Sequence, residues 1–142
     1  GAQNAIVVVD TTAAQLDRAQ QAGCRFAVSP GSPPALLDAA TRSDLPLLPG
    51  VSSATEAMAA ADRGYRFLKF FPAEAAGGIA MLKSLASPLQ DLRFCPTGGI
   101  NAAKARDYLA LPNVICVGGS WLTTDPNPAV IRARAAEARA MA

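Results

Sequence analysis

The sequence predicts an α/β fold built from parallel strands, and three observations support that prediction. Six short apolar runs with strand character recur along the 142 residues, the later runs start 20 to 26 residues apart, and helix signals fall between them. This spacing leaves room for a strand, a short helix and two loops each time. Successive βα units imply parallel strands joined by right-handed crossovers, so the repeat leaves a doubly wound sheet and a barrel open.

The expected elements alternate along a single domain that covers residues 1–142. The strands are expected at Ala5–Val9, Arg25–Val28, Leu45–Leu48, Phe67–Phe71, Arg93–Cys95 and Val114–Val117. Helix starts are indicated by Ser32-Pro33, by the capping box Ser53-Ala54-Thr55-Glu56, and by Asn101 and Asn127-Pro128, with helix stops at Gly23 and Gly64. A further helix is expected over Ala75–Leu85. No Pro/Gly/Ser-rich linker divides the sequence, which favours one core.

Composition and charge exclude several classes of function. Apolar residues make up 51% of the chain and charged residues 17%, a balance typical of a folded globular domain rather than a disordered one. The net charge of +2 is too small to predict a nucleic-acid or membrane surface. No apolar run approaches the ~20 residues that span a bilayer. Small anions remain possible partners.

The cysteines and the lack of histidine restrict the chemistry further. Cys24, Cys95 and Cys116 lie in or beside apolar runs, where a free cysteine is expected to be a small buried hydrophobe, and their odd number does not predict a disulfide framework. With no signal-peptide pattern at the amino terminus, a reducing cytoplasm is expected. The sequence has no histidine, which excludes Ser-His-Asp and Cys-His nucleophiles and the commonest zinc ligand. Lysine and the carboxylates must carry any acid-base chemistry.

A lysine lies inside the most apolar expected strand, which reads FLKFF over residues 67–71. Strand alternation places Phe67, Lys69 and Phe71 on one face, and it places Leu68 and Phe70 on the other, beneath helices. Because burial disfavours the charged ammonium, an enclosed lysine has a larger neutral fraction, and this form attacks a ketone to make a Schiff base. The alternative is that the stem of Lys69 covers apolar surface while its ammonium reaches water.

Two glycine pairs follow the last two expected strands, as Thr97-Gly98-Gly99 and Gly118-Gly119-Ser120. Glycine loops after neighbouring strands of a barrel suit phosphate binding through exposed backbone N–H groups. Each pair taken alone is more simply a tight turn. The dinucleotide fingerprint G-x-G-x-x-G does not follow the first expected strand, which disfavours nucleotide-cofactor binding.

Other polar residues have simpler structural interpretations. Lys83 and Lys104 are expected on solvated helix faces. Glu74 follows the lysine strand, where it would orient a water near Lys69 or, as we favour, cap the next helix. Ser29-Pro30-Gly31 and Pro49-Gly50-Val51 are expected to be loop turns at the rim of the sheet.

Five stretches of the chain match one known family in the same order. They read FAVSPG (26–31), PLLPGVSSATE (46–56), KFFPAEAAGG (69–78), FCPTGGINAAKARDYLAL (94–111) and VICVGGSW (114–121). These stretches closely resemble the 2-keto-3-deoxy-6-phosphogluconate (KDPG) and 4-hydroxy-2-oxoglutarate (KHG) aldolases. The resemblance implies a class I aldolase of the TIM (β/α)8-barrel family, trimeric and using no metal or organic cofactor. Such an enzyme cleaves the phosphorylated keto acid KDPG to pyruvate and glyceraldehyde 3-phosphate.

The resemblance also implies roles for individual residues. Lys69 corresponds to the Schiff-base lysine, whose iminium is the electron sink that lets the C3–C4 bond break. The phosphate site corresponds to Gly98, Gly99 and Ser120, with Gly118 and Gly119 shaping its second loop. The walls of the pyruvate and sugar-chain pocket correspond to Pro30, Phe71 and Thr97.

The resemblance leaves two barrel units without a counterpart. Counting back from the glycine loops makes residues 5–9 the third strand, so an incomplete barrel of about six βα units is expected. In the family the second strand carries a proton-shuttling glutamate and an arginine near the substrate carboxylate. The family loop Gly-Ala-Gly-Thr is replaced here by Val7-Val8-Val9-Asp10-Thr11. Loss of a general base costs on the order of 10²–10⁴ in rate, and Asp10 is a candidate replacement.

Three interpretations therefore stay open. The chain is an aldolase, active by itself or when the missing units are supplied by another chain. Alternatively, it is a noncatalytic barrel fragment that binds phosphate or self-associates through its unpaired sheet edges. A third possibility is an isomerase-like phosphate barrel in which Lys69 acts only through its charge.

Overall fold

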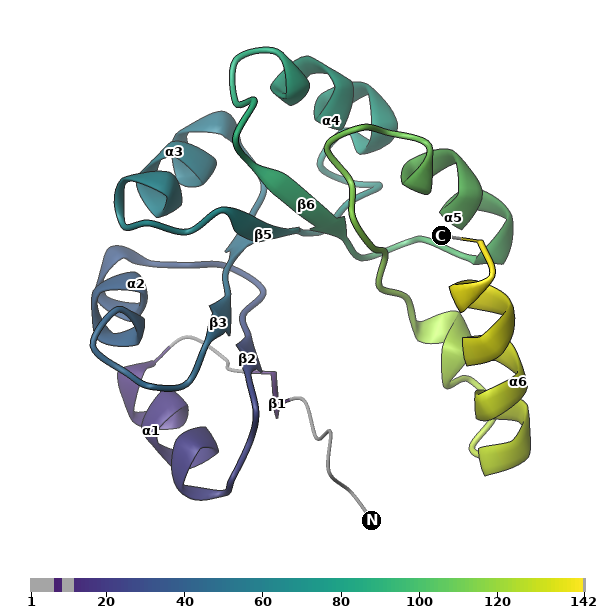
Figure 1. Cartoon of the computed structure of the whole chain (residues 1–142), viewed down its shortest axis with the longest axis horizontal. Helices are drawn as coiled ribbons and strands as arrows, with labels where there is room; N and C mark the ends of the chain where they lie inside the picture. Colours follow the sequence, from purple (N-terminus) through teal and green to yellow (C-terminus); the bar gives the residue numbers. More distant parts are fainter. Residues whose placement is uncertain (1–6, 9–11, 142) are drawn as a thin grey trace. The chain divides into compact units, whose positions relative to one another are not determined.

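The computed structural model describes residues 7–8 and 12–141, and these fall into two compact units. The first unit ends at Phe71 and the second begins at Pro72. Figure 1 shows that each helix of the first unit follows a strand along the chain and leads to another. Asp10, the candidate replacement base, lies outside the described residues.

The first unit repeats the βα pattern that the sequence predicts. Its elements are β1 (Val7–Val8), α1 (Ala13–Gln21), β2 (Ala27–Val28), α2 (Pro34–Ala40), β3 (Leu47–Leu48), β4 (Gly50–Val51), α3 (Ala54–Asp62) and β5 (Phe67–Phe70). The strands β1, β2 and β3 pair in parallel, and β4 pairs in parallel with β5. The parallel α/β class is thus confirmed.

Apolar side chains of α1, α2, β2, β3 and the turn before β3 form one core cluster of this unit. The cluster consists of Leu16, Ala19, Ala27, Leu36, Ala40, Leu45 and Leu47. Cys24 and Tyr65 pack against it and are partly buried. Gly23 and Gly64, which follow α1 and α3, have φ values of 76° and 90°, as expected of helix-ending glycines.

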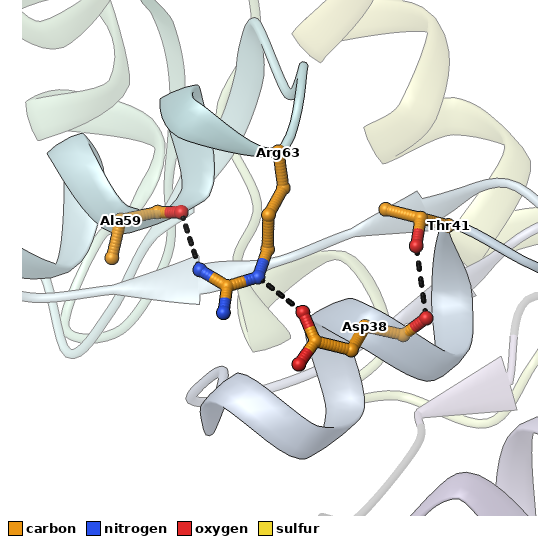
Figure 2. A network of polar contacts seen from close by, with 4 residues as sticks. All are labelled: Asp38, Thr41, Ala59 and Arg63. Atoms are coloured by element: carbon orange, nitrogen blue, oxygen red, sulfur yellow. Dashed lines mark hydrogen bonds and ion pairs between the residues drawn. The ribbon is translucent and has the colours of Figure 1, made fainter.

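Figure 2 shows a polar network between α2 and the end of α3. The Arg63 Nε donates to Asp38 Oδ1 at 2.5 Å, and Arg63 Nη1 donates to the Ala59 carbonyl at 3.0 Å. Thr41 Oγ1 donates to the carbonyl of Asp38 at 2.8 Å. The hydrogen bond from Arg63 holds the pKa of Asp38 below its usual value, so the pair stays ionised at neutral pH.

The second unit contains α4 (Gly78–Ala86), β6 (Arg93–Pro96), α5 (Ala102–Leu109), the 3-10 helix η1 (Ser120–Leu122) and α6 (Pro128–Arg139). Phe94 of β6 and Tyr108 of α5 are fully buried. The predicted starts of α5 and α6 are confirmed, because the Asn101 side chain accepts from the Lys104 N–H and that of Asn127 accepts from the Ala129 N–H.

Three predicted elements differ from the structure. The region Val114–Val117 forms no continuous strand; it has isolated parallel bridges, Phe94 with Val114 and Thr97 with Gly118. The helix expected over Ala75–Leu85 begins only at Gly78, after turns that follow β5. Gly50–Val51, expected as a turn, is strand β4, because its backbone pairs with Lys69 and Phe70.

The exposure of the cysteines also departs from the prediction. Cys24 and Cys95 are half-buried, whereas Cys116 is exposed, so the expectation of a buried hydrophobe is wrong for Cys116. All three are free thiols. Among the helices of the described residues, none is both long and apolar enough to cross a bilayer.

Candidate functional site

Lys69 lies in the middle of β5 and is buried. It pairs in register with Gly50 of β4, and its N–H donates to the Pro49 carbonyl at 2.9 Å. The flanking Leu68 and Phe70 are fully buried, as the predicted alternation requires, and Lys69 itself is 9% exposed. A lysine held to this degree of burial on a parallel strand is unusual, which marks it as a candidate catalytic residue.

The side-chain nitrogen of Lys69 lies over the aromatic ring of Phe71, the residue that follows β5. Its Nζ is 4.6 Å from the centroid of the Phe71 ring, within the range of a cation–π contact. The two side chains therefore share one side of the strand, as predicted. Phe67, expected on that same face, is 56% exposed.

Pro30 lies against Gly50, the residue that pairs with Lys69. A Cβ on Gly50 would lie 2.3 Å from the Pro30 carbonyl oxygen, so only glycine allows the two backbones to approach this closely. The Gly50 N–H donates to the hydroxyl of Ser29, a residue with no exposed surface, at 3.3 Å. Sequence reasoning treated Ser29 as part of a simple turn, and its burial is visible only in the structure.

In the second unit, the first glycine loop follows β6. Gly98 and Gly99 have φ values of 105° and 76°, which favour glycine. The loop is fastened to the turn after β5, because the Ala73 N–H donates to the Thr97 carbonyl at 2.8 Å and the Glu74 N–H donates to that of Gly98 at 3.2 Å. The backbone of this loop is therefore held in place rather than free.

The second glycine loop lies beside the first. Thr97 and Gly118 form a parallel bridge, and a Cβ on Gly118 would lie 2.6 Å from Thr97 Oγ1. The Gly118 N–H donates to the Pro96 carbonyl at 2.9 Å, so this N–H already has an acceptor within the protein. Next to it, a Cβ on Gly119 would lie 1.9 Å from the Trp121 ring, and the exposed Ser120 begins η1. The structure thus brings the two predicted loops together.

A three-residue network behind the first glycine loop was missed by the sequence analysis. The Glu74 carboxylate accepts hydrogen bonds from Lys104 Nζ and from the Tyr108 hydroxyl. The hydrogen bond from Lys104 is the largest cause that lowers the pKa of Glu74, and burial together with the Glu74 contact raises the pKa of Tyr108. Lys104 is therefore paired rather than simply solvated, and Glu74 does not cap α4. The i,i+4 spacing of Lys104 and Tyr108 on one helix face was the available signal.

The nine residues assigned by the resemblance lie in two separately described groups. Pro30, Lys69 and Phe71 belong to the first unit, whereas Thr97, the four glycines and Ser120 belong to the second. Over residues 7–8 and 12–141, no cluster of three or more Cys, Asp or Glu side chains is arranged to hold a metal ion.

Comparisons with known proteins agree on one family. A family model described as KDPG and KHG aldolase matches residues 3–133. The KHG/KDPG aldolase of Escherichia coli K12 is 53% identical over 108 residues, which cover 76% of this chain and 51% of that protein. The chain therefore spans about half the length of this curated relative.

Solved structures give the same result. The KDPG aldolase of Zymomonas mobilis ZM4, solved with 3-phosphoglycerate, is 46% identical with a TM-score of 0.90, over 95% of this chain and 66% of that one. The KDPG aldolase of Legionella pneumophila, solved with pyruvate captured as a covalent carbinolamine, is 43% identical with a TM-score of 0.82, over 94% and 64%. The chain belongs to the KDPG and KHG aldolase family.

Proposed function

We propose that this chain carries the Schiff-base lysine and the phosphate loops of a class I aldolase that cleaves KDPG to pyruvate and glyceraldehyde 3-phosphate. The observation that supports this most is Lys69, 9% exposed on β5 between two fully buried side chains. Family membership and the carbinolamine trapped in the Legionella relative point to the same chemistry.

Each candidate residue has a distinct proposed role. Lys69 is the nucleophile, and Phe71 and Pro30 line the pocket for the keto acid. In the second unit, Gly98, Gly99 and Ser120 bind the phosphate, and Thr97 lines the pocket for the sugar chain. Gly118 and Gly119 shape the second loop, since the Gly118 N–H is already donated to Pro96.

The reaction follows from an amine attacking a ketone. Neutral Nζ of Lys69 attacks C2 of the substrate, and loss of water gives an iminium. A base takes the proton of the C4 hydroxyl, the C3–C4 bond breaks, and its electron pair passes into the iminium to give an enamine. The aldehyde carrying the phosphate leaves. Protonation of the enamine at C3 and hydrolysis then release pyruvate and regenerate Lys69.

The proposal extends to the whole assembly. We propose that residues 1–142 form a single domain, an incomplete TIM barrel of about six βα units, that it self-associates as a homotrimer, and that it acts in the cytoplasm without a cofactor. The second candidate function is a noncatalytic barrel fragment that binds phosphate or self-associates.

Borohydride trapping tests the lysine directly. The chain is incubated with pyruvate, reduced with borohydride, digested with trypsin and analysed by mass spectrometry. A reduced adduct blocks cleavage after Lys69, so the expected product is the peptide 67–83 carrying one pyruvate-derived group. Lys69→Arg should abolish the adduct, and Lys83→Arg, which changes an exposed helix lysine, should leave the adduct at Lys69 intact.

A KDPG cleavage assay on the same samples separates the two candidate functions. An adduct with turnover supports the aldolase, and an adduct without turnover supports a chain in which Lys69 forms the Schiff base but cleavage does not follow. Absence of the adduct from a chain with a folded far-UV spectrum would overturn the role of Lys69 and leave the noncatalytic fragment.

A further inference from the structure

Two parallel bridges join β6 to the segment that follows α5, and their registers differ by one residue. Phe94 pairs with Val114, and Thr97 pairs with Gly118. Two residues therefore lie between the paired positions on β6, and three lie between them on the other segment. An extra residue on one side of a ladder is a β-bulge, in which two residues oppose one.

Counting from either bridge places the bulge opposite Cys95. One residue on from the Phe94 bridge, Cys95 opposes Ile115; two residues back from the Thr97 bridge, Cys95 opposes Cys116. The backbone bonds around the bulge agree, because the Ile115 N–H donates to Phe94 and the Gly118 N–H to Pro96, at 3.1 and 2.9 Å. The bulge therefore places Ile115 and Cys116 together opposite Cys95, on the neighbouring backbone segment.

The two thiols are in contact and differ in exposure. Cys95 is half-buried, with its Sγ 4.0 Å from the hydroxyl oxygen of Thr97, whereas Cys116 is exposed. A hydrogen bond from Cys95 lowers the pKa of Cys116 to about 7, although partial burial opposes the shift. A large fraction of Cys116 is therefore thiolate at neutral pH, which is the reactive form. Reactive, exposed cysteines next to a resolving thiol are the pattern that peroxide-sensitive sites share.

We propose that Cys95 and Cys116 form a redox-active dithiol, which hydrogen peroxide or an organic hydroperoxide oxidises to an intramolecular disulfide. Cys116 is the attacking residue because it is the exposed one, and Cys95 is the resolving residue because it lies across the bulge. This proposal does not depend on the aldolase activity, since neither cysteine has a role in that reaction.

The chemistry proceeds in two balanced steps. The Cys116 thiolate attacks one oxygen of hydrogen peroxide, the O–O bond breaks, and the departing hydroxide takes a proton to leave as water, giving a sulfenic acid. The Cys95 sulfur then attacks the Cys116 sulfur, the S–O bond breaks, and the hydroxyl group leaves as water with the proton of Cys95. Two thiols and one peroxide give one disulfide and two waters. A cellular dithiol reverses the product, as expected for a redox-sensing pair in a reducing compartment.

Peptide mapping after oxidation tests the pair. The full chain is reduced, freed of reductant, treated with one equivalent of hydrogen peroxide at pH 7.5, alkylated with iodoacetamide and digested with trypsin. The three cysteines fall in separate tryptic peptides, 19–25, 94–104 and 107–132. We expect peptides 94–104 and 107–132 to be linked, free thiols to fall from three to one per chain, and Cys24 to be fully alkylated.

Variants make the result specific. Cys24→Ser should leave the link unchanged. Cys95→Ser should stop the reaction at the Cys116 sulfenic acid, which dimedone traps, and Cys116→Ser should slow thiol loss at Cys95 by at least about tenfold because the reactive thiolate is gone. The proposal is overturned if all three thiols survive, if Cys116 oxidises without a link to Cys95, or if the main product joins two chains.

Discussion

The hydroxyl of Tyr108 donates a hydrogen bond to the carboxylate of Glu74, 34 residues earlier in the chain. The second oxygen of the same carboxylate accepts from Lys104 Nζ. Glu74 also fills the space beside Gly99, where a Cβ would lie 2.7 Å from Glu74 Cγ. The network joins α5 to the turn before α4, and the first glycine loop rests against it.

Removing the Tyr108 hydroxyl should weaken the second unit. Tyr108 is fully buried, so Tyr108→Phe leaves the ring packing intact and removes only a hydrogen bond to a charged acceptor. We expect the free energy of unfolding to fall by about 1.5–3 kcal/mol, measured by urea denaturation. Lys104→Met is the matched control: its side chain is 47% exposed, and loss of the ion pair should cost about 0–1 kcal/mol. If both variants lose the same unfolding free energy, the buried Tyr108 hydroxyl does not stabilise the unit more than the exposed Lys104 ion pair does.

The same carboxylate predicts an acid-sensitive contribution to stability. The hydrogen bonds from Lys104 and Tyr108 hold the pKa of Glu74 below its ordinary 4.5 in the folded state. The contribution of Glu74 to stability is therefore fully present above pH 4.5, and it is lost as the pH falls through the lower pKa that Glu74 has in the folded state. We expect the difference in unfolding free energy between wild type and Glu74→Gln to be constant near pH 7 and to shrink below pH 4.5. A difference that stays constant down to pH 3 would contradict this assignment.

Gly50→Ala should disrupt the strands around Lys69. The added methyl would lie 2.3 Å from the backbone oxygen of Pro30, and backbone atoms cannot move aside as a flexible side chain can. We expect a loss of about 3 kcal/mol in unfolding free energy and a smaller yield of the borohydride adduct at Lys69.

Gly31→Ala is the matched control for that prediction. Nothing lies within 4 Å of its added methyl and its backbone is not left-handed, so the change should be below about 1 kcal/mol. If Gly50→Ala is as stable as Gly31→Ala, the claim that the backbones of Pro30 and Gly50 leave no room for a methyl group is wrong.

The parts of the fold that sequence predicted well are those set by local chemistry. Asn101 and Asn127 start helices because their side chains bind N–H groups two or three residues ahead, an interaction contained within one turn. The burial of Leu68 and Phe70 followed from the two-residue period of a strand. The same period places Lys69 on the opposite face, but it left open whether the side chain would be enclosed or would reach water, and the structure buries it.

The parts that could not be predicted depend on partners far along the chain. The bulge opposite Cys95 exists because the Thr97 and Phe94 bridges are out of step, and no local pattern in residues 114–117 encodes that offset. Glu74 was assigned to the nearest helix, whereas its partners lie on α5. The exposure of Cys116 likewise could not be predicted from its apolar neighbours in sequence.

The start of α3 gives a final prediction. The Ser53 hydroxyl accepts from the Glu56 N–H at 3.3 Å, as the predicted capping box requires, but Glu56 Oε2 accepts from the N–H and hydroxyl of Ser52, at 2.6 and 2.9 Å. The reciprocal bond is therefore shifted by one residue. Ser53→Ala leaves a helix N–H without its acceptor and should cost about 1 kcal/mol, measured by urea denaturation.

Ser84→Ala provides the comparison for this change. The Ser84 hydroxyl donates to the Ala80 carbonyl at 3.0 Å within an exposed part of α4, a bond that competes with the helix rather than capping it. Alanine has the higher helix propensity, so this variant should be as stable as wild type or slightly more so. If both serine variants lose the same stability, the loss comes from a general effect of removing a hydroxyl, and the capping role of Ser53 is wrong.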